Sequence, residues 1–203
     1  MSTISEFLRD IERKTMEKTS SKKILSVANI AQIALAAAIM CVLGPFSIPI
    51  GPVPVSLTPF AVYLAAVVLG KYKGTIATLI YLLIGLCGVP VFSGFSGGAA
   101  KLFGPTGGYL VTFFVTAFIA GWFVEKSEKF WVRFLGCLLG LAVLYFVGTI
   151  WFMIGMSMAG KAMGLWASLM ACVIPFVPFD CVKIALALIL GGQIRKALNK
   201  AGL

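Results

Sequence analysis

The segment SLTPFAVYLAAVVLGKYKGTIATLIYLLIGLCGV, residues 56–89, determines the fold class. It contains two apolar blocks, 56–70 and 74–89, which are joined only by the tight basic turn 71–73. Each block is short for a membrane crossing, and short hydrophobic segments beside Pro- and Gly-rich linkers often line cavities rather than lipid. The segment therefore predicts two successive membrane helices that run in opposite directions.

Four further apolar blocks lie outward from this pair, at about 26–44, 108–124, 134–156 and 164–192. Pro175 and Pro178 interrupt the last block, so we expect its spanning part to begin near Phe176. The chain is 60% hydrophobic and 12% charged, whereas soluble proteins are about 25% charged. With about 20 residues for each crossing, the pattern predicts an all-α membrane protein with six transmembrane helices.

The basic residues predict the orientation of these helices. Of 17 lysines and arginines, two (Lys101 and Lys161) fall in the predicted outer loops, Lys183 falls within a helix, and the others share the side of the N-terminus. The positive-inside rule then makes both termini cytoplasmic. The net charge of +10 therefore reflects topology, and we expect no binding of nucleic acid. Residues 1–23 are expected to form a cytosolic segment, and residues 24–203 the transmembrane domain.

The residues that usually bind metals or carry out catalysis form no recognisable set. The chain has five cysteines and no histidine, and the cysteines have neither a CxxC motif nor metal-ligand spacing. Small apolar packing in helices is the simpler interpretation of these cysteines. We therefore expect no metal site and no enzymatic activity.

The motif PFDCVK, residues 178–183, contains Asp180 and Lys183, the one acidic and the one basic residue expected within the membrane. Positions i and i+3 share a helix face, so the pair could simply neutralise itself. Intramembrane charges are costly, however, and usually face a bundle interior or a water-filled cavity. An ion pair also adds little stability over apolar side chains. We therefore interpret the pair as a binding site in the outer half of the last helix.

The glycine-rich stretch GGAAKLFGPTGGYL, residues 97–110, invites comparison with a phosphate-binding loop. A Walker A loop requires G-x-x-x-x-G-K-[ST], but Ala100 precedes Lys101 and Leu102 follows it. The loop is also predicted to be extracellular. Two interpretations remain open: a plain glycine turn, or a site where glycines admit a ligand to free amides at a helix N-terminus.

Ala34 and Ala38 form a small-xxx-small pair in the first predicted helix, AQIALAAAIM, residues 31–40. Such a ridge lets a second helix approach closely. Spacing alone favours ordinary internal packing.

Taken together, these motifs resemble the BioY family, the biotin-specific substrate-binding subunits (S-components) of energy-coupling factor (ECF) transporters. The resemblance runs from the first helix to the last and rests on IPIGPVPVSLTPFAVYLAAVVLG (48–70), YLLIGLCGVPVFSGFSGG (81–98), GPTGGYL (104–110) and PFVPFDCVKIALAL (175–188). It implies six helices with biotin bound near the extracellular face.

The resemblance also implies roles for individual residues. The implied biotin-binding residues are Asp180, Lys183, Thr58, Lys101, Gly104, Pro105, Thr106, Gly107, Gly108 and Tyr109. The family's docking ridge matches Ala34 and Ala38, which makes contact with a coupling protein the expected role of this pair.

The implied function is high-affinity biotin uptake in the bacterial plasma membrane, without a cofactor. ATP would be hydrolysed by two partner ATPases that act through a transmembrane coupling protein, so this chain is not an enzyme. Two alternatives remain: an S-component for another small vitamin, or a proton-coupled secondary carrier with Asp180 as its relay.

Overall fold

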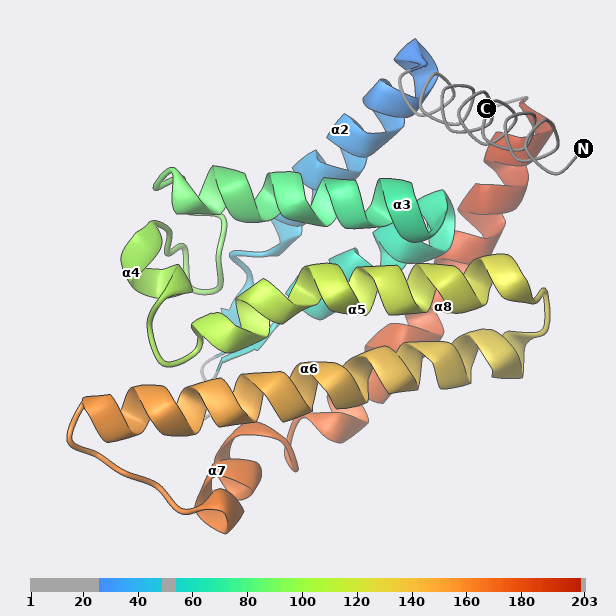
Figure 1. Cartoon of the computed structure of the whole chain (residues 1–203). Coiled ribbons are helices and arrows are strands. Elements are labelled where there is room, and N and C mark those ends of the chain that lie inside the picture. Colours follow the sequence, from blue (N-terminus) through green and yellow to red (C-terminus); the bar gives the residue numbers. More distant parts are fainter. Residues whose placement is uncertain (1–25, 49–53, 202–203) are drawn as a thin grey trace, which may run out of the picture.

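The computed structural model describes residues 26–48 and 54–201, and within them the chain is mostly helical (Figure 1). In chain order the elements are α2 (Val27–Leu43), β1 (Ser47–Ile48), β2 (Val55–Ser56), α3 (Thr58–Leu86), α4 (Ala99–Leu102), α5 (Gly107–Lys126), α6 (Phe130–Met158), α7 (Leu165–Cys172) and α8 (Val177–Lys200). The predicted cytosolic segment 1–23 lies outside the described residues.

Helix α3 contains both blocks of the segment that opened the sequence analysis, and it turns back on itself at Gly70. This residue has φ +79°, outside the helical region. A Cβ on Gly74 would lie 2.9 Å from the Cα of Ala66, although residues eight apart in a straight helix are about 12 Å apart. Figure 1 shows the two arms running in opposite directions. The predicted helix pair is therefore present, with the break one residue before the expected turn 71–73.

The helices pack around α3. Its arms contact α2, α5 and α8, and α5 also packs along α6. Close approach depends on small residues, because a Cβ on Gly121 would meet the backbone of Lys71, and a Cβ on Gly140 would meet Thr116. The core lies between the arms of α3, α5 and α6, and includes the fully buried Tyr63 and Tyr81.

Four helices are long and apolar enough to cross a membrane: α3, α5, α6 and α8. Helix α2 is apolar but has only 17 residues, and the hairpin α3 counts as one helix by its continuous assignment. The chain is thus a multi-pass membrane protein. These four helices correspond to five of the six predicted apolar blocks, because α3 contains two of them.

The predicted break in the last apolar block is confirmed. Helix α7 ends at Cys172, and α8 begins at Val177 with Phe176 as its N-cap residue. The predicted proline-rich loop contains more structure than expected, because β1 and β2 form a short antiparallel pair. A helix of four residues, α4, also lies within the glycine-rich loop.

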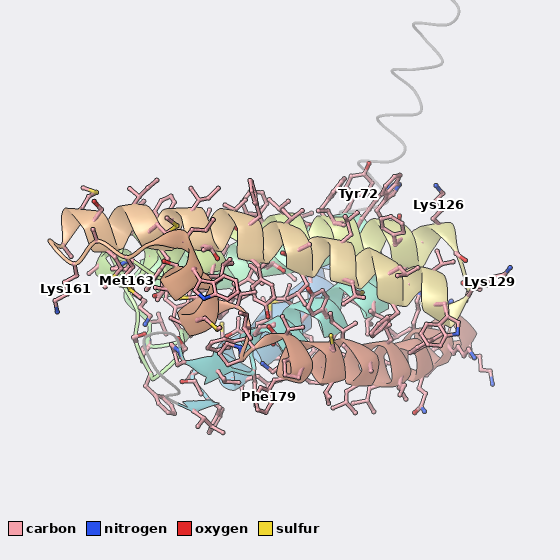
Figure 2. All side chains as sticks on the ribbon, turned by 90° about the horizontal axis from the view of Figure 1, so that it is seen from below. Tyr72, Lys126, Lys129, Lys161, Met163 and Phe179 are labelled. Atoms are coloured by element: carbon pink, nitrogen blue, oxygen red, sulfur yellow. The ribbon has the colours of Figure 1, made fainter. Side chains whose placement is uncertain are left out.

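The two ends of the bundle differ. Figure 1 places α4 and α7 at one end, and the start of α2 and the end of α8 at the other. Figure 2 shows Lys126 and Lys129 at the latter end, whereas Lys161 and Met163 lie at the end of α4 and α7. We call these the basic end and the loop end.

Candidate functional site

A pocket opens at the loop end, between α3, α5, α6 and α8. Its empty volume is about 630 Å³, including space open to solvent. Its lining residues are Pro54, Ser56, Thr58, Pro59, Ser93, Lys101, Thr106, Tyr109, Leu110, Phe113, Leu144, Tyr145, Cys172, Phe176, Asp180 and Lys183. Ligand sites typically have 300–1,000 Å³, mostly apolar walls and few polar groups, and this pocket has that character.

Asp180 is the most deeply buried charge in the pocket, with 4% of its surface exposed. It lies in the first turn of α8, where the helix dipole favours a negative charge. Lys183 donates from Nζ to Asp180 Oδ1 at 2.8 Å, and the Tyr145 hydroxyl donates to Oδ2 at 2.7 Å. Each carboxylate oxygen therefore has a donor, which offsets the cost of burying the charge.

Lys183 also donates to the backbone carbonyl of Ser56 at 2.8 Å. Ser56 ends β2, so this bond links α8 to the strand pair that precedes α3. An ammonium group has three donors, and two are used here. Lys183 therefore retains a donor for a ligand carbonyl, while Asp180 retains lone pairs for ligand N–H groups.

Three residues of the glycine-rich loop and its following helix line the same pocket. They are Lys101 in α4, Thr106 at the N-cap of α5, and Tyr109. Tyr109 shares a hydrogen bond of 3.1 Å with Thr149 Oγ1. The loop thus places a partly exposed cation in the pocket that contains the buried Asp180.

The other four predicted loop residues, Gly104, Pro105, Gly107 and Gly108, are absent from the lining. They pack against the protein itself. Trp151 Nε1 donates to the Gly104 carbonyl at 3.0 Å. A Cβ on Gly107 would overlap the Leu102 carbonyl, and one on Gly108 would overlap Trp151. These glycines allow the loop to lie close to α6 and thereby position Lys101 and Tyr109.

Thr58 is buried in the pocket wall, with 1% of its surface exposed. Its hydroxyl donates to the Gly44 carbonyl at 3.4 Å. Ala34 and Ala38 lie away from this site on α2, and both are exposed. Ile33 and Ala37 point into the core instead.

Sequence reasoning missed two polar groups of the site. Tyr145 lies within a long apolar run, where a tyrosine is most simply an interface anchor or packing residue. The Ser56 carbonyl has no sequence signal, because any residue carries a carbonyl.

Burial raises the pKa of the Cys172 thiol to about 11, so this residue contributes a neutral side chain to the pocket wall.

Known proteins resemble this chain over most of its length. The BioY family matches residues 16–200. The probable biotin transporter BioY of Pyrococcus horikoshii is 38% identical over 171 residues, which is 84% of this chain and 98% of the relative. The biotin transporter BioY of Thermotoga maritima is 40% identical over 150 residues, which is 74% of this chain and 85% of the relative.

A solved structure also resembles this chain. The crystal structure of the S-component for biotin from an ECF-type ABC transporter has a TM-score of 0.75 and 32% sequence identity, covering 84% of this chain and 92% of that one. Because the family match and the relatives both extend across the helices that form the pocket, this chain belongs to the BioY family.

Proposed function

We propose that this chain is the biotin-binding S-component of an ECF-type transporter, and that it captures biotin in the loop-end pocket. The observation that carries the proposal is the buried set of Asp180, Lys183 and Tyr145 in a largely apolar pocket. The family membership and the biotin-transporting relatives support the choice of ligand.

Biotin has chemistry that this set can recognise. Its ureido group has two N–H donors and one carbonyl, its bicyclic ring is apolar, and its valerate ends in a carboxylate. Asp180 would accept from the N–H groups, and Lys183 would donate to the carbonyl. Tyr109 and Phe113 supply aromatic wall, and Lys101 or the amides at the start of α5 would hold the carboxylate.

The arrangement in the membrane is part of the same proposal. The six crossings would be α2, the two arms of α3, α5, α6 and α8, with the basic end in the cytoplasm of a bacterial cell. A coupling protein would dock on the ridge Ala34–Ala38, and two ATPases would supply energy. The chain itself would bind and release biotin without chemical change, so it is not an enzyme.

Binding of biotin by the purified full chain tests the ligand. Isothermal titration calorimetry without ATP should give tight binding in about a one-to-one ratio. Riboflavin and thiamine, which lack a ureido group on an apolar bicycle, serve as control ligands. No binding of biotin combined with binding of a control vitamin would refute the assignment.

A further inference from the structure

One side chain of α6, Trp151, is bonded to the turn that joins α4 to α5 at the loop end (Figure 1). Its indole Nε1 donates to the Gly104 carbonyl at 3.0 Å, and the same carbonyl accepts from the Gly107 amide at 2.9 Å. A carbonyl oxygen has two lone pairs, so both acceptor positions of Gly104 are used. The rigid indole therefore ties the middle of this turn to α6.

The turn also packs directly on the same face of α6. Positions 151 and 155 are four apart, so they are neighbours on the helix surface. A Cβ on Gly155 would lie 2.9 Å from the Cα of Pro105, and a Cβ on Gly108 would overlap the side chain of Trp151. This packing keeps the turn from moving closer to α6, and the indole N–H holds it against moving away.

Helix α4 lies between two points of attachment. Before it, the Gly98 amide donates to the Gly85 carbonyl of α3 at 2.7 Å. After it comes the bond from Trp151, and in the described part of the chain no other hydrogen bond joins residues 99–105 to α3, α6 or α8. The position of Lys101, which belongs to α4 and lines the pocket, therefore depends on Trp151.

Lys101 is a suitable partner for an anionic group of a ligand. It is partly exposed, and it forms no ion pair within the described part of the chain. Thr106, the N-cap residue of α5, lines the same pocket. An ammonium group and nearby backbone amides at a helix start can together hold a carboxylate.

We propose that Trp151 is a positioning residue for the ligand carboxylate: its bond to Gly104 keeps Lys101 and Thr106 in the pocket wall. Trp151 itself does not line the pocket, so it acts through the loop. Without the indole N–H, Lys101 would lose the fixed geometry that a charge contact needs. The residue would thereby set the preference for biotin over neutral derivatives with the same rings. This inference rests on the proposed function, which takes biotin as the ligand and places its carboxylate at the loop.

Calorimetry of the full chain with biotin and biotinamide separates this role from purely structural support. Biotinamide keeps the bicyclic ring and the side chain of biotin but has a neutral carboxamide in place of the carboxylate. The wild-type chain should prefer biotin by about fivefold, the size expected of a partly exposed charge contact. Trp151→Phe, which keeps an aromatic ring but has no N–H donor, should lose about fivefold in affinity for biotin and keep its affinity for biotinamide.

Two further variants accompany this measurement. Trp122→Phe is the matched control, because it makes the same change in a ring that is 45% exposed and lies 5.3 Å from Lys126 Nζ at the basic end. It should leave both affinities unchanged. Gly155→Ala adds a methyl group against Pro105 and displaces the turn without removing the indole, so it should show the same selective loss as Trp151→Phe.

Retained binding of biotinamide shows that a variant is folded, and Gly155→Ala decides the question if Trp151→Phe does not fold. Equal affinities of the wild-type chain for the two ligands would overturn the inference. An equal loss for both ligands in Trp151→Phe, an unchanged affinity for biotin, or the same selective loss in Trp122→Phe would also overturn it. A wild-type chain that binds neither ligand would instead refute the proposed function, and the inference would fall with it.

Discussion

Asp180 and Lys183 show how a single turn of helix can bury a charge pair in the wall of a pocket. Each would be costly to bury alone, but at i and i+3 they form an ion pair of 2.8 Å, which Tyr145 and the Ser56 carbonyl complete. Replacing such a set with apolar side chains would often be neutral or stabilising. Stability therefore does not explain why these buried charges are present. Their position in the pocket wall fits the proposed role in ligand binding instead.

Asp180→Asn should weaken biotin binding more than Lys101→Ala. The first change removes a charged acceptor and leaves Lys183 unpaired, and hydrogen bonds to charged groups are worth about 1.5–3 kcal/mol, so affinity should fall at least tenfold. Lys101 is partly exposed, where a charge contact is worth about 1 kcal/mol or less. Calorimetry on both variants measures the order, and a larger loss in Lys101→Ala would reverse it.

Tyr145→Phe should reduce biotin affinity by about tenfold, because the Asp180 carboxylate loses the donor that fixes its orientation. Tyr81→Phe is the matched control: its hydroxyl donates to the Val91 carbonyl, and its ring is fully buried outside the pocket lining. Both variants should lose thermal stability, but only Tyr145→Phe should lose affinity. Similar affinities for the two variants would show that Tyr145 has a purely structural role.

At this scale the sequence predicted the charge pair but not its surroundings. Asp180 and Lys183 are rare residue types at helical spacing, so their proximity followed from the sequence. Tyr145 reaches Asp180 across 35 residues of chain. That contact depends on which face α6 turns toward α8, which a nearly uniform apolar run does not indicate.

At the scale of the elements, the close contacts between α6 and the glycine-rich loop depend on glycines. Gly148 of α6 lies directly behind the ring of Tyr109, where a Cβ would overlap the ring. The neighbouring Gly155 and Trp151 contact the loop residues Pro105 and Gly108 in the same way. Helix α6 thus supports the glycine-rich loop from behind along one face.

Gly148→Ala should displace Tyr109 from the pocket wall and weaken biotin binding. Overpacking of this kind typically costs about 1–3 kcal/mol, and we expect it to lower both the unfolding temperature and the affinity. The matched control is Gly192→Ala in α8, because a Cβ there meets open space. Calorimetry and thermal unfolding of both variants provide the readout, and an unchanged affinity in Gly148→Ala would mean that Tyr109 does not contact biotin.

The helix pair of α3 was predictable from its apolar blocks and basic turn, but the location of its break was not. Gly70 adopts the positive φ, and Glu125 of α5 then accepts from the Lys71 amide at 2.9 Å. The pattern alone could not choose between Gly70 and Gly74 as the point of reversal. Gly74 is needed instead where the arms approach each other. Tertiary contacts decided between two residues of the same type.

In the proposed function, the whole molecule would separate two tasks, ligand binding and docking of a coupling protein. The pocket lies at the loop end, whereas α2, which carries Ala34 and Ala38, begins at the basic end. In lipid there is no hydrophobic drive between helices, so close packing must supply association. A smooth, exposed ridge of alanines is suited to that contact, and no hydrogen bond in the described part of the chain connects it to the pocket.

Ala34→Leu or Ala38→Leu should therefore leave biotin affinity nearly unchanged and abolish both uptake and copurification with the coupling protein. The larger side chain would hold a partner helix several ångströms away without touching the pocket. Ile39→Leu, which keeps the side-chain volume on another face of the same helix, is the control and should transport normally. Affinity is measured by calorimetry, and uptake by vesicles that contain the whole complex, with and without ATP. Normal uptake by the ridge variants would mean that the alanines do not dock a partner. A loss of biotin affinity would show that α2 shapes the pocket. Uptake without ATP would favour a secondary carrier.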